Sequence, residues 1–212
     1  MKMPNMENSA WFNLCRRHVF GLCAPMDPKD FRGKAVLHFS DTPSTFYRGM
    51  RQLIELFEPV CVVHTGDLAD EIKLELRPGE LPRYRKKLEE LASAMSAVKR
   101  DKLVIVTGNH DHEESVRDFF PGVNVIADRG RIEMCGLDLN LSHSPEALLV
   151  PLSHYNMFGH TCPRGLVEGE GTRLLNGLNA VHALNVETGE VLLIPYPGYV
   201  NDARFNRKKI GL

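Results

Sequence analysis

The sequence predicts an α/β protein in which two β-sheets pack face to face and helices lie on the outside. Two observations support this fold class. Residues 34–120 alternate short apolar segments with amphipathic segments of helical period, which is the order of a βαβαβ unit. Residues 123–195 instead contain short strand patterns separated by turn residues. The 212 residues suffice for one domain with a sizeable core, so we expect an N-terminal extension over residues 1–30 and a domain over residues 31–212.

The first half of the domain contains three apolar segments that are predicted strands, Lys34–Phe39, Val60–His64 and Leu103–Val106. The segment Ser44–Phe57 between the first two is a predicted helix, because its apolar residues recur at helical spacing. A strand-helix-strand order of this length predicts a parallel pair of strands joined by a right-handed crossover.

The clearest helix pattern follows the turn at Pro78-Gly79, where apolar residues are spaced by three and four and charged residues occupy the opposite face. The apolar residues are Leu81, Tyr84, Leu88, Leu91, Met95 and Val98. A shorter helix is predicted over Glu113–Phe120, because its first turn is acidic and Pro121-Gly122 ends it.

The second half of the domain is predicted to consist mainly of short strands. They are Val123–Ile126, Arg131–Met134, Leu137–Leu141, Tyr155–Phe158, Thr172–Leu175 and a hairpin of Ala180–Val186 with Val191–Pro195. Outside these elements, the apolar patch Trp11–Leu22 predicts a helix packed on the outside of the domain. The basic run Arg204–Lys209 predicts a solvated C-terminal tail.

Charge and cysteine content exclude several classes of protein. A formal net charge of −1 gives no general electrostatic attraction to nucleic acid or membranes. No apolar run is long enough to cross a bilayer, and no signal peptide is recognisable. The five cysteines are scattered without the paired spacings of a disulfide framework or a zinc ribbon. These features predict a cytoplasmic protein in a reducing compartment.

Polar residues of metal-binding type follow five of the predicted strands. They are Asp41, Gly66-Asp67, Gly108-Asn109-His110-Asp111, His143 and Gly159-His160-Thr161-Cys162. A single Asp or His after a strand is usually a turn residue or an ordinary surface group. Ligands of α/β sheets bind at the carboxyl ends of the strands, so five such groups together predict one metal site at that edge.

This series of residues resembles the calcineurin-like metallophosphoesterases, whose pattern is Asp-x-His, Gly-Asp, Gly-Asn-His-Asp/Glu, His and Gly-His-x-His in that order. Gly66-Asp67, Gly108–Asp111 and Gly159-His160 match the pattern letter for letter, and the resemblance covers Lys34–Tyr199. It implies a four-layer α-β-β-α sandwich with a dinuclear metal centre between the C-terminal edges of the two sheets.

The resemblance also implies a role for each matching residue. Asp67 corresponds to the carboxylate that bridges two metals, and Asn109, His143 and His160 correspond to the ligands that complete one metal site. Asp41 belongs to the other site. One or two divalent ions per chain are therefore expected, and the sequence does not distinguish manganese, zinc, iron and nickel.

The sequence departs from the family pattern twice, and both departures fall on the site of Asp41. Pro43 stands where the pattern has the His of Asp-x-His, and Cys162 stands where it has the final His. Proline has no side-chain ligand atom, whereas a cysteine thiolate binds softer metals such as zinc. Asp41, Asp67 and Cys162 are therefore the ligands expected to remain, and we expect reduced metal affinity at this site.

Four other histidines come into question as replacements for the missing ligand. His38 and His64 each precede a site Asp by three residues, and strand alternation turns them to the opposite face of the sheet. His112 and His154 stay open as candidates, because only their proximity in sequence to the site residues recommends them.

The chemistry implied is metal-dependent hydrolysis of a phosphate mono- or diester by in-line attack of a metal-bound hydroxide. The expected substrate is a small molecule. The resemblance makes His110 the general acid for the leaving alkoxide and places Asn109 and His110 against the substrate phosphate. Asp111 is expected to orient His110 or its loop.

A second hypothesis is an impaired member of the family that serves as a binding or scaffold module. Retention of Asn109, His110, His143 and His160 favours the enzyme, because a scaffold has no use for a general acid. Pro43 in place of a histidine favours the scaffold.

Overall fold

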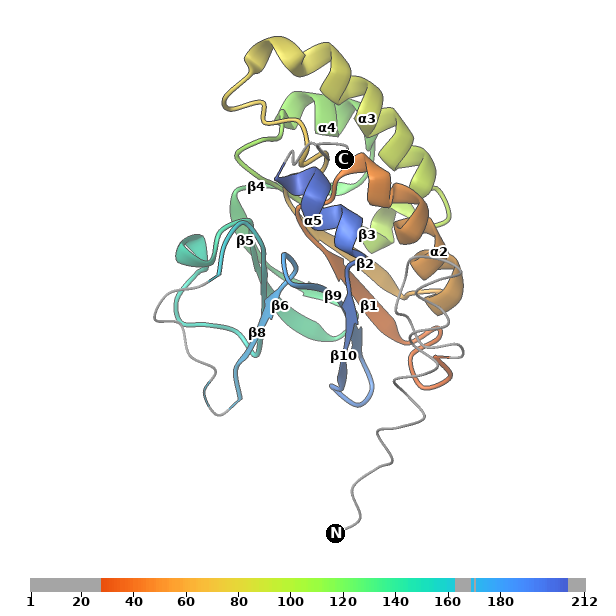
Figure 1. Cartoon of the computed structure of the whole chain (residues 1–212). Coiled ribbons are helices and arrows are strands. Elements are labelled where there is room, and N and C mark those ends of the chain that lie inside the picture. Colours follow the sequence, from red (N-terminus) through yellow and green to blue (C-terminus); the bar gives the residue numbers. More distant parts are fainter. Residues whose placement is uncertain (1–27, 163–168, 170, 206–212) are drawn as a thin grey trace.

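The computed structural model describes residues 28–162, 169 and 171–205, which form a mixed α/β fold with two sheets (Figure 1). The first sheet has six strands in the order β10-β9-β1-β2-β3-β4, and the second has four in the order β5-β6-β7-β8. The strands of the first sheet are β1 (Ala35–Phe39), β2 (Cys61–Thr65), β3 (Leu103–Thr107), β4 (Asn124–Ala127), β9 (Ala180–Asn185) and β10 (Val191–Pro195). Those of the second are β5 (Arg129–Met134), β6 (Leu137–Ser142), β7 (Tyr155–Phe158) and β8 (Arg173–Asn176).

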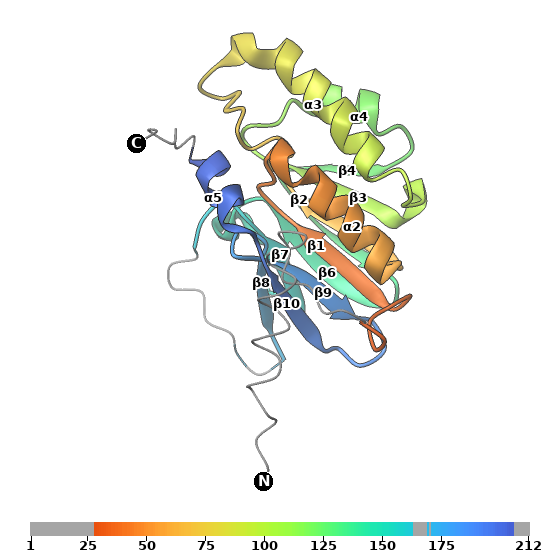
Figure 2. The same ribbon diagram turned by 45° about the vertical axis from the view of Figure 1, so that its right-hand side comes forward.

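Strand alternation divides the core into two layers. Leu37 and Val62 face the helices, where they pack in one apolar cluster with residues of α2 (Tyr47–Phe57), α3 (Leu81–Ala94), α4 (Glu113–Phe119) and α5 (Gly198–Arg204). Val36 and Val63 face the other way, toward Leu139 and other residues of the second sheet. The predicted arrangement of two facing sheets with helices outside is confirmed, and Figure 2 shows α2, α3 and α4 on the face of the first sheet away from the second.

The predicted parallel pairing of the first two strands is confirmed, since β1 and β2 are parallel, with Val36 opposite Cys61 in the register. Strands β2 and β3 are also parallel, and so are β6 and β7. The carboxyl ends of these strands consequently lie at one edge of the sandwich. Residues that follow them are brought together there.

Two elements of the predicted second half belong to the first sheet. β4 pairs parallel with β3 and forms one edge, and the β9-β10 hairpin adds to the other side, with β9 antiparallel to β1. The alternation of apolar and polar residues does not show which sheet a strand joins, because the pairing depends on contacts with segments that are distant in sequence.

Two features differ from the sequence expectation. α3 ends at Ala94 rather than continuing to Val98, because Met95 leaves helical geometry (φ −92°, ψ 5°). Met95 is still buried and Val98 packs against the same core, so the apolar spacing reflects burial that continues past the helix. The prediction of a solvated tail from Arg204 onward is wrong for Arg204 itself, which lies at the end of α5 and is only 4% exposed.

The predicted helix over Trp11–Leu22 and residues 206–209 of the basic run lie outside the described residues. Within the described part of the chain, no helix has the length and apolar character needed to cross a bilayer. Cys61, Cys135 and Cys162 carry free thiols.

Candidate metal centre

The loops that follow β1, β2 and β3 meet those that follow β6 and β7 at the carboxyl edge of the two sheets. The backbone N–H of Asp41 donates to the carbonyl of Gly66 (3.0 Å), which joins the first two loops. In the second sheet, the N–H of Gly159 donates to the carbonyl of His143 (2.9 Å). The N–H of His160 then donates to Oδ2 of Asp41 (3.0 Å), so the two sheets are connected through a candidate ligand.

Three of the candidate ligands have backbone conformations in the left-handed region. The φ angles are 50° at Asp41, 54° at Asp67 and 62° at His160. Asp and His occur in this region more often than most residues, although the crowding of Cβ makes it costly for any residue other than glycine. Strained residues of this kind collect at functional sites, where the surrounding structure holds them in place.

The first cluster of ligand atoms surrounds His143. Its Nε2 lies 3.0 Å from Oδ1 of Asn109, 3.2 Å from Nδ1 of His160 and 3.4 Å from Oδ1 of Asp67. His143 and Asp67 are buried, with exposures of 4% and 2%. The structure therefore brings together the four residues that the sequence assigned to one metal site.

The hydrogen bonds of this cluster fix which atoms carry protons. Nδ1 of His143 lies 2.7 Å from the carbonyl oxygen of Thr65, which can only accept, so this nitrogen is the donor. In the neutral imidazole Nε2 then bears a lone pair. The Nδ2 group of Asn109 donates to Oε2 of Glu75 (2.6 Å), which turns the amide oxygen toward the same Nε2. Two acceptors thus face one another, an arrangement that a cation between them satisfies.

The second cluster consists of the carboxylates of Asp41, Asp67 and Asp70, whose ligand oxygens all lie within 4.8 Å of one another. All three residues are at most 3% exposed. Burial, followed by the negative charges of Asp111 and Asp41, raises the pKa of Asp67 well above its usual range. Buried carboxylates at this separation repel one another unless positive charge lies among them.

Asp111 holds the Asp67 loop against the Asn109 loop. Its Oδ2 accepts from the backbone N–H groups of Asp67 and Gly108 (both 2.8 Å), and its Oδ1 accepts from the N–H of Leu68 (2.9 Å) and the hydroxyl of Tyr84 (2.8 Å). All four donors come from the loops or from α3. Of the two roles expected for Asp111, the contacts favour positioning of the loops.

His110 lies at the edge of the clusters. Its backbone N–H donates to Oδ1 of Asp67 (3.1 Å), and Nδ1 of its ring lies 3.8 Å from Oε2 of Glu75. Burial, followed by the positive charge of Lys73, lowers the pKa of His110. Its side chain is 11% exposed, which leaves part of the imidazole accessible from the solvent side.

Neither departure from the family pattern contributes a ligand atom to these clusters. Cys162 was expected near Asp41, but its exposed thiol lies 4.0 Å from Oδ1 of Asn179 and belongs to neither group of ligand atoms found among the described residues. Pro43 precedes the short 3₁₀ helix η1 (Ser44–Phe46), and its carbonyl accepts from the N–H of Phe46 (2.8 Å).

The four other histidines have partners elsewhere. Nε2 of His38 lies 2.9 Å from the hydroxyl of Thr65, and Nε2 of His64 lies 2.8 Å from the hydroxyl of Thr42. His112 caps α4 by accepting from Ser115. Nδ1 of His154 lies 2.5 Å from the carbonyl of Gly171. Among the described residues, none of the four histidines belongs to the first or the second cluster.

Several residues at the centre were missed by the sequence reasoning, namely Asp70, Lys73, Glu75 and Arg204. The first three lie between the predicted strand Val60–His64 and the predicted helix that begins at Leu81, a segment for which the sequence analysis makes no site prediction. Arg204 reaches the centre from α5: its Nε donates to the carbonyl of Asp41 (2.6 Å) and its Nη2 to that of Ser40 (3.1 Å). The spacing Asp67-x-x-Asp70 was the available signal for the third carboxylate.

Close packing at the centre explains two of its glycines. A Cβ at Gly66 (φ 96°) would lie 2.5 Å from Nδ1 of His143 and 2.7 Å from the backbone nitrogen of Gly108. A Cβ at Gly159 would overlap the side chains of Ser40 and Asp41. Any larger residue would therefore displace a candidate ligand.

An open cleft of about 540 Å³ gives access to the first cluster. It is lined by Glu75, Thr107, Gly108, Asn109, Ala127, Asp128, His143, Ser144 and His160. Its volume is in the range that accommodates a small organic molecule.

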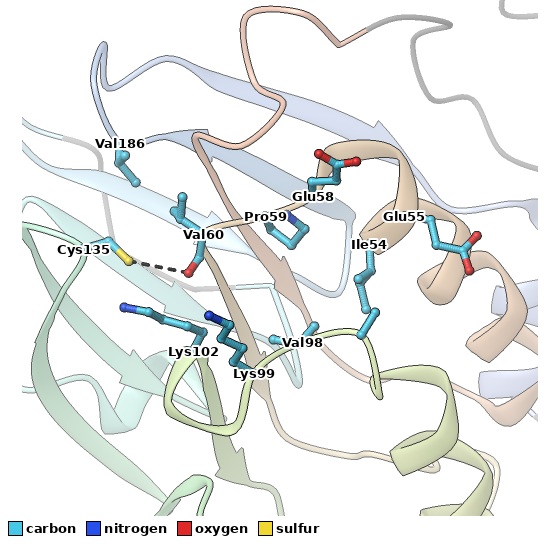
Figure 3. Close-up of a pocket in the computed structure, with 11 residues that line it drawn as sticks. Ile54, Glu55, Glu58, Pro59, Val60, Val98, Lys99, Lys102, Cys135 and Val186 are labelled. Carbon is cyan, nitrogen blue, oxygen red and sulfur yellow. Dashed lines mark hydrogen bonds between the residues drawn. The ribbon is translucent and has the colours of Figure 1, made fainter.

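A larger cavity of about 830 Å³ lies between the segment after α2 and the segment before β3 (Figure 3). Its wall is mainly apolar, with Val60, Val98 and Val186, and it also carries Lys99 and Lys102. None of the clustered metal-ligand groups of the described chain lines it. The smaller cleft is the one lined by candidate ligands, namely Asn109, His143 and His160.

A protein-family model matches the part of the chain that contains these clusters. The model of the calcineurin-like phosphoesterase family matches residues 34–177. Curated protein sequences give no match. Among solved structures, one that is similar is Yfce, a phosphoesterase from E. coli, with a TM-score of 0.49 and 18% identity over 77% of this chain and 100% of that chain. The family model spans more than half of the chain and includes all the clustered residues, so the protein belongs to the calcineurin-like phosphoesterase family.

Proposed function

We propose that this protein hydrolyses a phosphate mono- or diester with a divalent metal ion held by Asp67, Asn109, His143 and His160. The observation that carries the proposal is the convergence of Asn109 Oδ1, His160 Nδ1 and Asp67 Oδ1 on Nε2 of His143, at 3.0 to 3.4 Å. The family binds divalent metals, and this donor set of imidazole, amide and carboxylate suits manganese, zinc, iron or nickel.

The remaining chemistry is performed by residues of the cleft. A divalent ion, when bound, supplies an acidified water and relieves charge on the phosphoryl oxygens. Nδ1 of His143 keeps its proton on the carbonyl of Thr65 and so keeps Nε2 directed at the ion. Asn109 contacts the substrate phosphate from the opposite loop, and its amide is fixed by Glu75.

His110 is proposed as the general acid. An imidazolium can protonate the alkoxide that leaves phosphorus, and the ring of His110 is partly exposed beside the Asn109 loop. Asp111 supports this role indirectly, because it binds the N–H of Gly108 two residues before His110.

A second candidate function is a binding or scaffold module that retains the fold and one ion. The observation that favours it is the absence of an imidazole from the Asp41–Asp67–Asp70 cluster of the described residues. Such a module would bind metal and a phosphorylated ligand without turnover.

The two functions are separated by a hydrolysis assay with manganese on a model phosphomonoester and a model phosphodiester, both with activated leaving groups. The enzyme hypothesis expects turnover of at least one ester, lost in the His143→Ala variant. The scaffold hypothesis expects metal binding with no turnover by either protein. The cleft volume favours small substrates, so both esters should enter it.

A further inference from the structure

The second cluster of the centre differs in composition from the first. It contains Asp41, Asp67 and Asp70, with carboxylate oxygens within 4.8 Å of one another and no imidazole or thiol among its grouped atoms. The family pattern expects two histidines there, and this chain has Pro43 and Cys162 at those positions. The residues present therefore do not reproduce the nitrogen ligands of a second metal site.

A cationic side chain is already bound to this cluster. Nζ of Lys73 donates to Oδ1 of Asp70, three residues earlier in the chain, in an ion pair whose carboxylate is 4% exposed and whose lysine side chain is 24% exposed. The backbone around Lys73 is fixed, because its carbonyl accepts from the N–H groups of Leu76 (3.0 Å) and Arg77 (2.8 Å). The N–H of Asp70 donates to the carbonyl of Thr42 (3.2 Å), which fixes the pair beside the β1 loop.

The ammonium brings positive charge to a group of carboxylates. Asp70, which pairs with Lys73, has its ligand oxygen within 4.8 Å of those of Asp41 and Asp67. At such short separations in a buried site the charge of Lys73 acts on all three carboxylates.

We propose that the Lys73 ammonium is the second cation of this centre, so that the chain binds one divalent ion tightly where the family pattern has two. The inference rests on the proposed function for the site of the first ion. An ammonium is a compact charge with three donors and can neutralise carboxylates or contact phosphoryl oxygens. It also repels a second divalent ion from the Asp41–Asp67–Asp70 cluster.

The test is the metal stoichiometry of the full chain, measured by titration of the metal-free protein with Mn²⁺. Electron paramagnetic resonance of the loaded protein distinguishes an isolated ion from two coupled ions. The wild-type protein is expected to bind one ion and to give the spectrum of isolated Mn²⁺. Lys73→Met is expected to raise affinity for a second ion about tenfold or more and to produce the coupled spectrum, because the competing charge is gone.

Two variants serve as controls. Lys73→Arg keeps the positive charge and is expected to retain one ion. Lys87→Met removes a lysine of the same side-chain exposure, 24%, which also pairs at i,i+3, with Glu90 on α3, and it should leave the stoichiometry at the wild-type value. Melting curves identify any variant that fails to fold. If Lys73→Met does not fold, the uncharged Lys73→Gln takes its place with the same expected result, and two ions in the wild type overturn the inference in either case.

Two ions of similar affinity in the wild-type protein would overturn the inference while leaving the proposed hydrolysis intact. One ion in both the wild-type and a folded Lys73→Met protein, with no gain in second-ion affinity, would also overturn it. One ion in the wild type and two in Lys73→Met, without hydrolysis of any ester, would support the inference and contradict the proposed function instead.

Discussion

Nε2 of His143 and Oδ1 of Asn109 lie 3.0 Å apart, and with a neutral imidazole the surrounding hydrogen bonds make both of them acceptors. Two lone pairs at this distance repel unless a proton or a metal ion lies between them. Because the proton of the His143 ring is already used at the Thr65 carbonyl, the pair is preorganised for a cation.

Replacement of His143 is expected to weaken metal binding. His143→Ala removes the nitrogen on which the three other ligands converge, so the Mn²⁺ dissociation constant should rise by about 100-fold or more, since loss of even an outer-shell partner costs about 10- to 100-fold. Isothermal titration calorimetry measures this change. His154→Ala is the matched control, because that imidazole is exposed and contacts the Gly171 carbonyl, and unchanged affinity is expected there. Equal losses of Mn²⁺ affinity in both variants would show that His143 is not a metal ligand.

Replacement of His110 is expected to affect turnover more than metal binding. For a substrate with a poor leaving group, His110→Ala should lower kcat by about 10²- to 10⁴-fold, the range for loss of one acid catalyst. An activated ester needs little protonation of its leaving group and should lose much less. If both esters slowed equally, His110 would have another role.

Asp111→Asn is expected to destabilise the fold as well as the site. The amide would direct an NH₂ group toward backbone donors now satisfied by a carboxylate, at a cost of about 2 to 4 kcal/mol for lost charged bonds and an unsatisfied donor. Tyr84→Phe removes a single donor and should cost about 1 kcal/mol. Urea unfolding of both variants measures the difference. A wild-type unfolding free energy for Asp111→Asn would show that the loops do not depend on this carboxylate.

Stability is expected to fall in mild acid because of His182. Burial lowers the pKa of His182 to about 4, from 6.5 in an unfolded chain. Below pH 6.5 the unfolded state therefore binds more protons than the folded state, and the unfolding free energy falls as the pH drops from 6.5 to about 4. This residue contributes roughly 2 to 3 kcal/mol to that loss.

The check is urea unfolding of the wild type and of His182→Gln at several values between pH 7 and pH 4. The variant should show a shallower loss of stability, and His154→Gln, which changes an exposed imidazole, should retain the wild-type slope. Parallel curves for the wild type and His182→Gln would contradict the role of His182. His38 and His64 are also buried with lowered pKa, so part of the slope should persist.

The parts of the fold predicted from the sequence are those set by local periodicity. The strands that end before Asp41, Asp67 and Asn109 were recognised because apolar runs stop at polar residues there. The sequence did not predict which sheet β4 joins, because the short segment Asn124–Ala127 is compatible with either sheet. Its pairing with β3 places it in the first sheet.

The sequence predicted those site residues that directly follow a strand and match the family pattern. Asp70 and Lys73 lie within a loop whose path is determined by backbone hydrogen bonds to residues distant in sequence, such as that from Asp70 to Thr42. Arg204 is distant from every motif in the sequence and reaches Asp41 only because α5 packs beside the β1 loop. Such contacts have no local signature.

The most direct test of the central claim is to measure Mn²⁺ binding and ester hydrolysis on the same sample of metal-free protein. We expect no hydrolysis without metal and a rate that rises in proportion to the fraction of His143-dependent sites filled, saturating when they are full. His143→Ala should show neither binding nor rate at the same concentrations. Hydrolysis that persists after metal removal, or a filled site with no hydrolysis of any ester, would contradict the claim that this centre is a metal-dependent phosphoesterase site.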